Sequence, residues 1–429
     1  MKRTKFLQNL GLLSGGLVMG PIAKLYGLDS PFSQALKQSN NDDDFWRIIR
    51  EQFVFPDDYI YMNTGGIGAL PSLVINKVTT SLNEQERYPR PGHSEDSWIN
   101  IKKTCAPFFG PECKVKELAL NSCATEGINI ILNGIGLKNG DEIITSTHEH
   151  PALHVPLLNH HRMNQVNIKT FDPDMLSADG NIDRISRLIT RKTRMIFISH
   201  VTCTTGQVFP IREIGELARR KGIILAVDGA QAPGSMEINL RELNVDYYAC
   251  SGHKWMLGPK RTGILYVPSE NLDFLQPTTV GAYSDGGYDI SNMSLTLQDS
   301  AQRFEFGTQN EPLFLGLGAG AQFVQTIGLE KVQAHNRELA EAFYEGLSGI
   351  KGVEILSPQE KEFRSSMISF RIQGHQAQKI SNFLGSGKAI RVRVVTEAGL
   401  NGVRVSFHLY NQRFEVDSII NKITDFTKQ

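Results

Sequence analysis

A lysine set among small and aromatic residues is the most informative chemical feature of this sequence. Lys254 stands between His253 and Trp255, and an apolar stretch upstream of it ends in Asp228. A lysine can form an imine with the aldehyde of pyridoxal phosphate, and a carboxylate can keep the ring nitrogen of that cofactor protonated. The apolar residues on both sides of Lys254 argue against an ordinary surface lysine. The pattern therefore predicts a pyridoxal phosphate site built on Lys254 and Asp228.

Three stretches offer hydrogen-bond donors for the phosphate group of such a cofactor. A strand and a turn of small residues lead into a helix that begins near Ala124 and Thr125, and the free N–H groups of a helix N-terminus bind phosphate well. Ser251 and His253 come just before the lysine, and Thr308 opens a long helix. For Thr125 and for Thr308, a simple helix cap explains the local sequence about equally well.

Two more residues have side chains suited to the same site. His150 follows a predicted strand, where an imidazole can stack on a cofactor ring, although a lone histidine is more often structural. Arg404 lies in an alternating strand segment and can bind a carboxylate through two parallel hydrogen bonds. The alternative for Arg404 is a solvated charge on a strand.

Alternating strands and helices must hold these residues in place. Short apolar strands separated by helices predict an α/β fold with a mostly parallel, seven-stranded sheet covered by helices. In such sheets the ligands bind beyond the carboxyl ends of the strands, which is where the residues above fall. The predicted strands are Glu117–Leu120, Glu142–Ser146, Val166–Thr170, Met195–Ser199, Ile223–Val227, Asp246–Ala249 and Gly263–Val267.

The pattern predicts a second, smaller domain after the cofactor-binding one. Residues 45–310 form the large α/β domain, and residues 311–429 form a small α+β domain. The small domain is expected to open with a helical stretch over Leu313–Leu347 and to contain a strand over Ile390–Val395. Residues 28–44 are expected to form a polar linker.

The N-terminus resembles an export signal. Lys2, Arg3 and Lys5 precede an apolar run of a length that suits a signal peptide, and the pair of basic residues resembles a twin-arginine signal. We therefore expect residues 1–27 to direct export to the periplasm. The alternatives are a cytoplasmic protein and a membrane-tethering tail.

The amino-acid composition argues against nucleic acid and metal ions as partners. Forty-five basic residues balance 45 acidic ones, so no overall field attracts nucleic acid. The five cysteines are scattered and form no metal-binding pattern, so we expect no metal site. The expected partner is a small amino-acid-type molecule that is recognised locally.

Together these motifs resemble the class V aminotransferase family of fold-type I pyridoxal phosphate enzymes, over about residues 45–428. That family includes cysteine desulfurases, aminotransferases and proteins similar to isopenicillin N epimerase. The resemblance implies that Lys254 carries the cofactor, Asp228 pairs with the ring nitrogen, Gln231 binds the ring hydroxyl and His150 stacks on the ring. It also implies a homodimer with active sites at the interface. The remaining implied contacts are with the phosphate, for Ala124, Thr125, Ser251, His253 and the neighbouring subunit's Thr308, and with the substrate carboxylate, for Arg404.

Two departures from the family pattern bear on the reaction. Desulfurase-like members carry a catalytic cysteine ahead of the arginine strand, whereas Arg391–Leu400 contains none. Cys203 stands where many members have an asparagine near the ring hydroxyl.

The segment Asn63–Pro71 is most similar to the epimerase-like branch, so we expect an epimerase-like enzyme that acts at the α-carbon of an amino acid. The alternatives are an aminotransferase and a C–S lyase. A non-catalytic binding protein is disfavoured by the intact lysine and aspartate. Candidates for a second base are Tyr61, His93 and His200.

Overall fold

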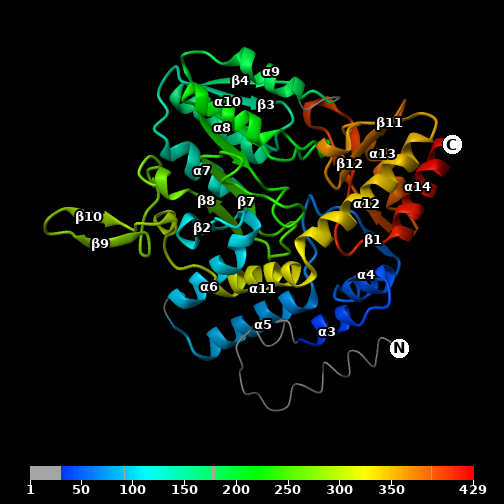
Figure 1. Cartoon of the computed structure of the whole chain (residues 1–429), viewed down its shortest axis with the longest axis horizontal. Helices are drawn as coiled ribbons and strands as arrows, with labels where there is room; N and C mark the ends of the chain where they lie inside the picture. The colour runs from blue at the N-terminus through cyan, green and yellow to red at the C-terminus, as the bar shows by residue number, and fades with distance from the viewer. Residues whose placement is uncertain (1–29, 91, 176–178, 388) are drawn as a thin grey trace.

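A seven-stranded sheet forms the centre of the computed structural model, which describes residues 30–90, 92–175, 179–387 and 389–429. The strand order is β2-β8-β7-β6-β5-β3-β4, and β8 is the single strand that runs against its neighbours (Figure 1). The predicted mostly parallel α/β sheet is confirmed. The strands are β2 (Leu118–Asn121), β3 (Glu142–Ser146), β4 (Asn167–Phe171), β5 (Thr193–Ser199), β6 (Ile224–Asp228), β7 (Tyr247–Ser251) and β8 (Gly263–Tyr266).

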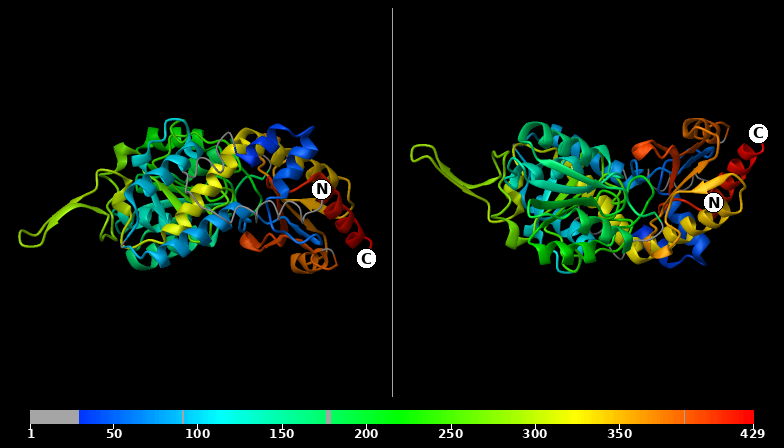
Figure 2. Two further views of the ribbon diagram at one scale, coloured as in Figure 1. Left: turned by 90° about the horizontal axis from the view of Figure 1, so that it is seen from below. Right: turned by 90° about the horizontal axis from the view of Figure 1, so that it is seen from above.

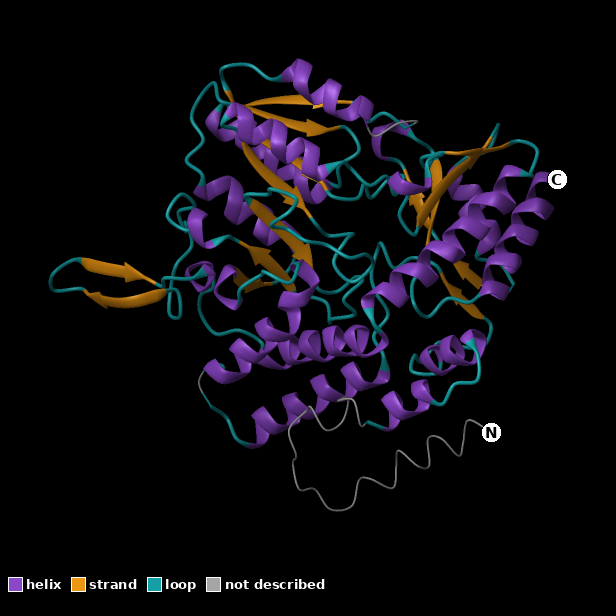
Figure 3. Cartoon of the chain, in the orientation of Figure 1, coloured by secondary structure: helices purple, strands orange, loops and turns teal. Residues whose placement is uncertain are grey.

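Both faces of the central strands are buried, which explains why β5 and β6 are mostly apolar, whereas the edge strand β4 is largely exposed. Along β5, Ile196 and Ile198 join one core cluster while Met195 and Phe197 join another on the opposite face, as the two-residue period of a strand requires. Helices cover both faces (Figure 3). The helices around the sheet are α6 (Glu95–Cys105), α7 (Ala124–Gly134), α8 (Pro151–Asn164), α9 (Asp179–Leu188), α10 (Ile211–Lys221) and α11 (Glu311–Ile327), and α5 (Ser72–Arg87) packs on α11.

The helical stretch expected over Leu313–Leu347 is two helices rather than one. Helix α11 ends before Gly328, helix α12 (Leu329–Ser348) begins after it, and the two axes are bent by 79°. Gly328 has a φ of +97°, a conformation that side chains disfavour. Helix α11 packs on α5 and α6, whereas α12 packs on α14 (Arg413–Thr427). The break therefore carries the chain from one core to the next.

A four-stranded antiparallel sheet in the order β11-β12-β15-β14 forms the second core. The strand expected over Ile390–Val395 is interrupted at Val392, because its first half pairs with β1 and its second half pairs with β15. The division between domains at residue 311 stays a prediction. The elements are β1 (Tyr59–Tyr61), β11 (Val353–Ile355), β12 (Met367–Ile372), α13 (Ala377–Leu384), β13 (Ala389–Arg391), β14 (Arg393–Val395) and β15 (Gly402–Ser406).

The segment expected to be a linker contains a helix. Helix α3 (Pro31–Lys37) is capped by Ser30, whose hydroxyl accepts from the Ser33 N–H at 3.0 Å. Phe32 stacks on Phe323 of α11 with ring centroids 5.0 Å apart, which ties this helix to the large core. Helix α4 (Asp42–Arg50) follows. The export signal expected over residues 1–27 lies outside the described residues.

A hairpin of β9 (Asp285–Asp289) and β10 (Ser294–Leu297) projects from the body of the molecule (Figure 2). Tyr288, Ile290 and Met293 are exposed on it. Among the described residues no single helix is both long and apolar enough to cross a membrane, although the bent pair α11 and α12 passes that test jointly.

Candidate active site

A cavity of about 170 Å³ lies where the carboxyl ends of three parallel strands meet. Ser199 ends β5, Asp228 ends β6 and Ser251 ends β7, and strand register places the first two side by side. This is the position that ligands occupy in open α/β sheets. The predicted site residues that line the cavity are Ala124, Thr125, His150, Asp228, Gln231, Ser251, His253, Lys254 and Arg404.

Lys254 is buried beneath a backbone loop that the sequence reading did not assign to it. The N–H of Gly68 donates to the His253 carbonyl at 2.8 Å, and a Cβ atom on Gly68 would lie 2.0 Å from the Lys254 carbonyl oxygen. Only glycine permits this approach. Burial, opposed by the charge of Asp228, lowers the pKa of the Lys254 amine to about 8. A lysine with that pKa supplies a useful fraction of neutral amine near pH 7.

Asp228 is buried at the end of β6, where its Oδ1 accepts from the Ala230 N–H at 2.9 Å. Burial raises the pKa of this carboxyl, and the charge of Lys254 opposes the rise. A buried carboxylate needs an ionic or hydrogen-bonded partner. The protonated ring nitrogen of pyridoxal phosphate is a partner of that kind.

Glu149 is a second buried carboxyl beside Asp228, and the sequence reading overlooked it. Its Oε1 accepts from the Ser146 hydroxyl at 2.6 Å, and its Oε2 accepts from the Ser199 N–H at 3.0 Å and from the Ser199 hydroxyl. Burial raises its pKa to about 7, and the charge of Asp228 contributes to the rise. Glu149 thus ties the end of β3 to the end of β5, next to the loop that carries His150.

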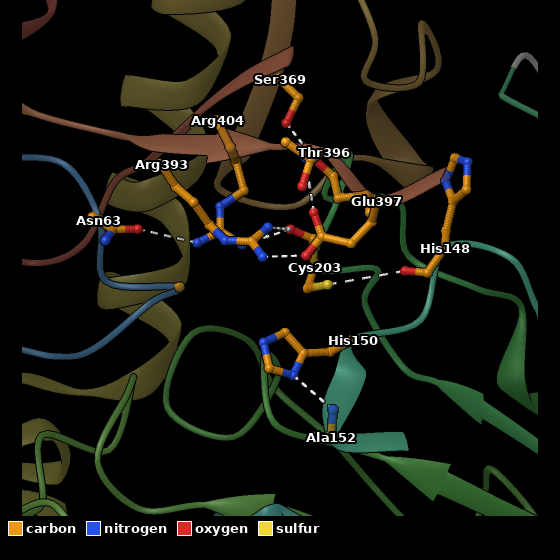
Figure 4. A network of polar contacts seen from close by, with 12 residues as sticks. Asn63, His148, His150, Ala152, Cys203, Ser369, Arg393, Thr396, Glu397 and Arg404 are labelled. Atoms are coloured by element: carbon orange, nitrogen blue, oxygen red, sulfur yellow. Dashed lines mark hydrogen bonds and ion pairs between the residues drawn. The ribbon is translucent and has the colours of Figure 1, made fainter. Parts of the chain in front are cut away.

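His150 caps helix α8 and keeps its ring inside the cavity. Its Nδ1 accepts from the Ala152 N–H at 3.0 Å, so Nδ1 carries no proton (Figure 4). Burial, with the nearby charge of Lys254, lowers the pKa of the ring to about 4. A neutral imidazole with a fixed tautomer is suited to packing against a cofactor ring.

The donors proposed for a phosphate group converge at the N-terminus of α7. The Ala124 N–H donates to the Ser251 hydroxyl at 3.2 Å, and Thr125 lies in the first turn of that helix. The Nδ1 of His253 is buried and has no hydrogen-bond partner. A buried polar atom without a partner is costly, and a phosphate oxygen would satisfy it. These residues fit the phosphate of pyridoxal phosphate.

Gln231 and Cys203, the two positions that the resemblance associates with the ring hydroxyl, both line the cavity. Gln231 donates from Nε2 to the Gly65 carbonyl at 2.9 Å, and its Oε1 accepts from the Trp255 indole at 2.9 Å. Cys203 lines the cavity, its Sγ contacts the His148 carbonyl at 3.9 Å, and burial raises the pKa of the thiol to about 11. This thiol is therefore a neutral group rather than a reactive thiolate.

Arg404 brings the second sheet into the site. It is 1% exposed, its Nη1 donates to the Cys203 carbonyl at 2.5 Å, and its Nη2 donates to Asn63 Oδ1 at 3.2 Å. Its Nε is buried and has no partner. Burial, with the nearby charge of Arg393, lowers the pKa of the guanidinium to about 10.

Four of the residues proposed from sequence lie away from this cavity. Thr308 does not line the cavity of its own chain, so its contact with a neighbouring subunit stays a prediction. Tyr61 donates to the Ile67 carbonyl at 2.6 Å, His93 stacks on Trp98 and His200 bonds the Tyr248 hydroxyl at 2.9 Å. None of these three candidates for a second base lines the cavity.

A family model described as Aminotransferase class-V matches residues 93–419 of this chain. The chain belongs to the aminotransferase class-V family. It is 33% identical over 344 residues to a probable cysteine desulfurase of Mycobacterium leprae, covering 76% of this chain and 80% of that protein. It is 27% identical over 340 residues to a probable cysteine desulfurase of Pyrococcus abyssi, covering 76% and 82%.

Solved structures agree with this assignment. A cystine C–S lyase in complex with its product cysteine persulfide is 25% identical, with a TM-score of 0.78, over 85% of this chain and 97% of that one. A variant of the lyase with glycine covalently linked to its pyridoxal phosphate cofactor has a TM-score of 0.80 at 25% identity, over 88% and 99%. The predicted fold-type I architecture and the pyridoxal phosphate cofactor are therefore confirmed. The epimerase-like branch is not confirmed, because these relatives are probable cysteine desulfurases and a cystine C–S lyase.

Proposed function

We propose that this protein is a C–S lyase that eliminates the sulfur substituent of an S-substituted cysteine. Water is consumed, the Cβ–S bond breaks with its electron pair on sulfur, and the products are a thiol or persulfide, pyruvate and ammonium. Elimination agrees better than epimerisation or transamination with the similarity to probable cysteine desulfurases and to a cystine C–S lyase whose product is cysteine persulfide.

The observation that carries this proposal is the chemistry of the segment Arg391–Leu400 beside the cavity. Desulfurase-like proteins carry a cysteine there, whereas this segment contributes Arg393 to the cavity and contains no cysteine. Cys203, which does line the cavity, is held protonated by burial. A persulfide-forming thiolate is therefore missing from the part of the site that the structure describes, and the sulfur has to leave with the substrate fragment.

Each part of the elimination has a residue suited to it. Arg404 binds the substrate carboxylate and fixes its orientation. The amine of Lys254, with a pKa of about 8, takes the proton from the α-carbon. Asp228 keeps the ring nitrogen of the cofactor protonated, and pyridoxal phosphate supplies the electron sink that makes this proton acidic.

Epimerisation has less support because it needs an acid on the face opposite Lys254. Tyr61, His93 and His200 do not line the cavity, and His150 is neutral with its Nδ1 occupied. Cys203 lines the cavity with a protonated thiol, but burial raises the pKa of that thiol to about 11, so it is a weak acid for this role.

The test is product analysis with S-methylcysteine and cystine as substrates. The elimination proposal predicts pyruvate and ammonium in equal amounts, without an added keto acid, and their loss in Lys254→Ala. Loss of optical rotation without pyruvate would support the epimerase instead. A requirement for a keto acid acceptor would support an aminotransferase, and alanine formed from cysteine would support a desulfurase.

We also propose that the protein works as a homodimer in which Thr308 contributes to the neighbouring subunit's phosphate site. Its position outside the cavity of its own chain supports this arrangement. Sedimentation of the loaded protein tests the dimer, and Thr308→Val tests the contact through a weaker affinity for pyridoxal phosphate. A monomer with full cofactor affinity would contradict both parts.

A further inference from the structure

Two arginines face each other across strands β14 and β15 at the edge of the cavity. Arg393 is the register partner of Arg404, and both line the cavity. Both also donate from Nη1 to the carbonyl oxygen of Cys203, at 3.4 Å and 2.5 Å. Like charges directly opposite each other destabilise an antiparallel pair. A concentration of positive charge that the fold does not require points to an anionic ligand.

Glu397 gives Arg393 a charge partner that Arg404 lacks. Its Oε1 forms an ion pair with Arg393 Nη2, and its Oε2 accepts from the Thr396 N–H at 3.1 Å (Figure 4). Burial acts to raise the pKa of Glu397, but the hydrogen bond and charge of Arg393 lower it overall, so the carboxylate is ionised at neutral pH. Among the described residues, no carboxylate forms an ion pair with Arg404.

The two arginines are therefore chemically distinct. Arg404 is a buried cation with neutral partners only, so it suits a single carboxylate. Arg393 and Glu397 are half-buried, with side-chain exposures of 21% and 14%, and together form a neutral pair of opposite charges. A ligand that opens this pair without replacing both charges would leave a partly desolvated ion without a partner.

We propose that the Arg393–Glu397 pair binds the far end of the substrate, and that this end is itself an amino-acid group with an ammonium and a carboxylate. This proposal rests on the proposed C–S lyase function and names its substrate class: a disulfide or thioether that joins two amino acids. The second carboxylate binds Arg393 and the second ammonium binds Glu397. Each ion of the pair then exchanges one charged partner for another of the same sign, so neither is left unpaired.

The spacing of the two arginines agrees with this class of substrate. Because both Nη1 atoms bond to one carbonyl oxygen, they lie no further apart than the sum of the two bond distances. A disulfide holds its two α-carbons roughly 5.5–6 Å apart. One such molecule can therefore present its two carboxylates to Arg404 and Arg393 together.

Four substrates separate the contributions of the two charges. Cystine has both charges at its far end, the cysteine–cysteamine disulfide has only the ammonium, the cysteine–3-mercaptopropionate disulfide has only the carboxylate, and S-methylcysteine has neither. We expect Glu397→Gln to lower kcat/KM for cystine and for the cysteamine disulfide by at least about tenfold relative to S-methylcysteine. Arg393→Gln is expected to do the same for cystine and for the mercaptopropionate disulfide. Equal losses with all four substrates in both variants would overturn the proposal.

Glu354→Gln is the matched control. Glu354 pairs with Arg371 between β11 and β12, at 2.9 Å and 2.7 Å, in the same small sheet but outside the cavity lining. The Glu354→Gln substitution also removes a carboxylate that is ion-paired with an arginine, but it does so outside the cavity. The ratio of cystine to S-methylcysteine turnover should therefore stay at the parent value. A change in that ratio as large as that in Glu397→Gln would show that the effect is not local to the cavity.

A binding measurement keeps this proposal separate from the lyase proposal. In Lys254→Ala, which lacks the base, calorimetry gives the affinity for cystine directly. Adding Glu397→Gln should weaken that affinity by at least about tenfold. If pyruvate forms but the affinity and the substrate ratios do not change, the subsite is refuted and the lyase stands. If no substrate yields pyruvate but the affinity still depends on Glu397, the lyase fails and the binding site stands.

Discussion

The rate at which cofactor-free protein captures pyridoxal phosphate should follow the ionisation of the Lys254 amine. Only a neutral amine attacks an aldehyde, and burial lowers the pKa of this amine from 10.5 to about 8. The capture rate should therefore rise with pH and level off near pH 9. An ordinary lysine would give a rate that continues to rise to about pH 10.5.

The size of the effect follows from these two pKa values. With a pKa of about 8, roughly a quarter of the amine is neutral at pH 7.5 and roughly nine-tenths at pH 9, so the rate should rise about fourfold over that interval. With a pKa of 10.5, the same interval would give a rise of about thirtyfold with no plateau. Measurements above pH 7.5 avoid the second ionisation of a phosphate monoester, which lies near 6.

Stopped-flow absorbance gives the capture rate between pH 7.5 and 10.5, and borohydride trapping followed by peptide mass locates the attachment. Asp228→Asn is the matched control, because the charge of Asp228 raises the pKa of the amine. In that variant the plateau should begin at a lower pH. A parent rate that still grows tenfold per pH unit above pH 9, or a trapped cofactor on another residue, would refute the reasoning.

Four further predictions concern single features. Asp228→Asn should keep the cofactor but lower kcat roughly 10²- to 10⁴-fold, since the ring nitrogen loses its counter-charge; near-parent turnover would exclude that role. Burial raises the pKa of Glu149 from 4.5 to about 7, so the folded state binds this proton more tightly than the unfolded state does. The free energy of unfolding should therefore fall by up to about 3 kcal/mol as pH rises from 4.5 to 7. Urea unfolding at pH 4.5 and at pH 7 measures this decrease in the free energy of unfolding, which should be smaller in Glu149→Gln than in the parent. An equal decrease in the two proteins would contradict the prediction. Gly68→Ala should destabilise the protein by about 1–3 kcal/mol through the clash with the Lys254 carbonyl, while Gly349→Ala should not, because its added Cβ would make only an ordinary van der Waals contact, at 3.9 Å from the Gly346 carbonyl oxygen. Fractionation should find the mature protein outside the cytoplasm, and finding it only in the cytosol with its first residues intact would reject the export prediction.

The central sheet and most of the cavity were predictable because they depend on local patterns. A strand buried on both faces is a short apolar run, and such runs between helices indicate a parallel sheet. The position of polar residues at strand ends then follows from the topology, since the carboxyl ends of parallel strands meet at one edge. Asp228 follows from this reasoning, whereas Ser251 is indicated by its place just before Lys254.

The rest depends on contacts between distant segments. Gly68 looks like any loop glycine until its backbone is seen against the Lys254 carbonyl. The break at Val392 has no strong local signal, because it arises from pairing with two different partners. The juxtaposition of Arg393 and Arg404 follows from that break and from the register of β14 and β15. Sequence periodicity alone does not give cross-strand register.

The energetics of Arg404 explain why a carboxylate belongs in this cavity. The hydrogen bonds from its two Nη atoms end on a carbonyl and an amide oxygen, which satisfy donors but do not neutralise charge. The fall in its pKa from 12.5 to about 10 corresponds to about 3 kcal/mol of unfavourable environment for the charged form. A carboxylate that enters the cavity removes this penalty, and the unpartnered Nε offers it a hydrogen bond at once. Relief of the free-energy cost of burying Arg404 without a counter-ion thus adds to the binding free energy of an amino-acid substrate. Only ligands that carry a negative charge relieve this cost.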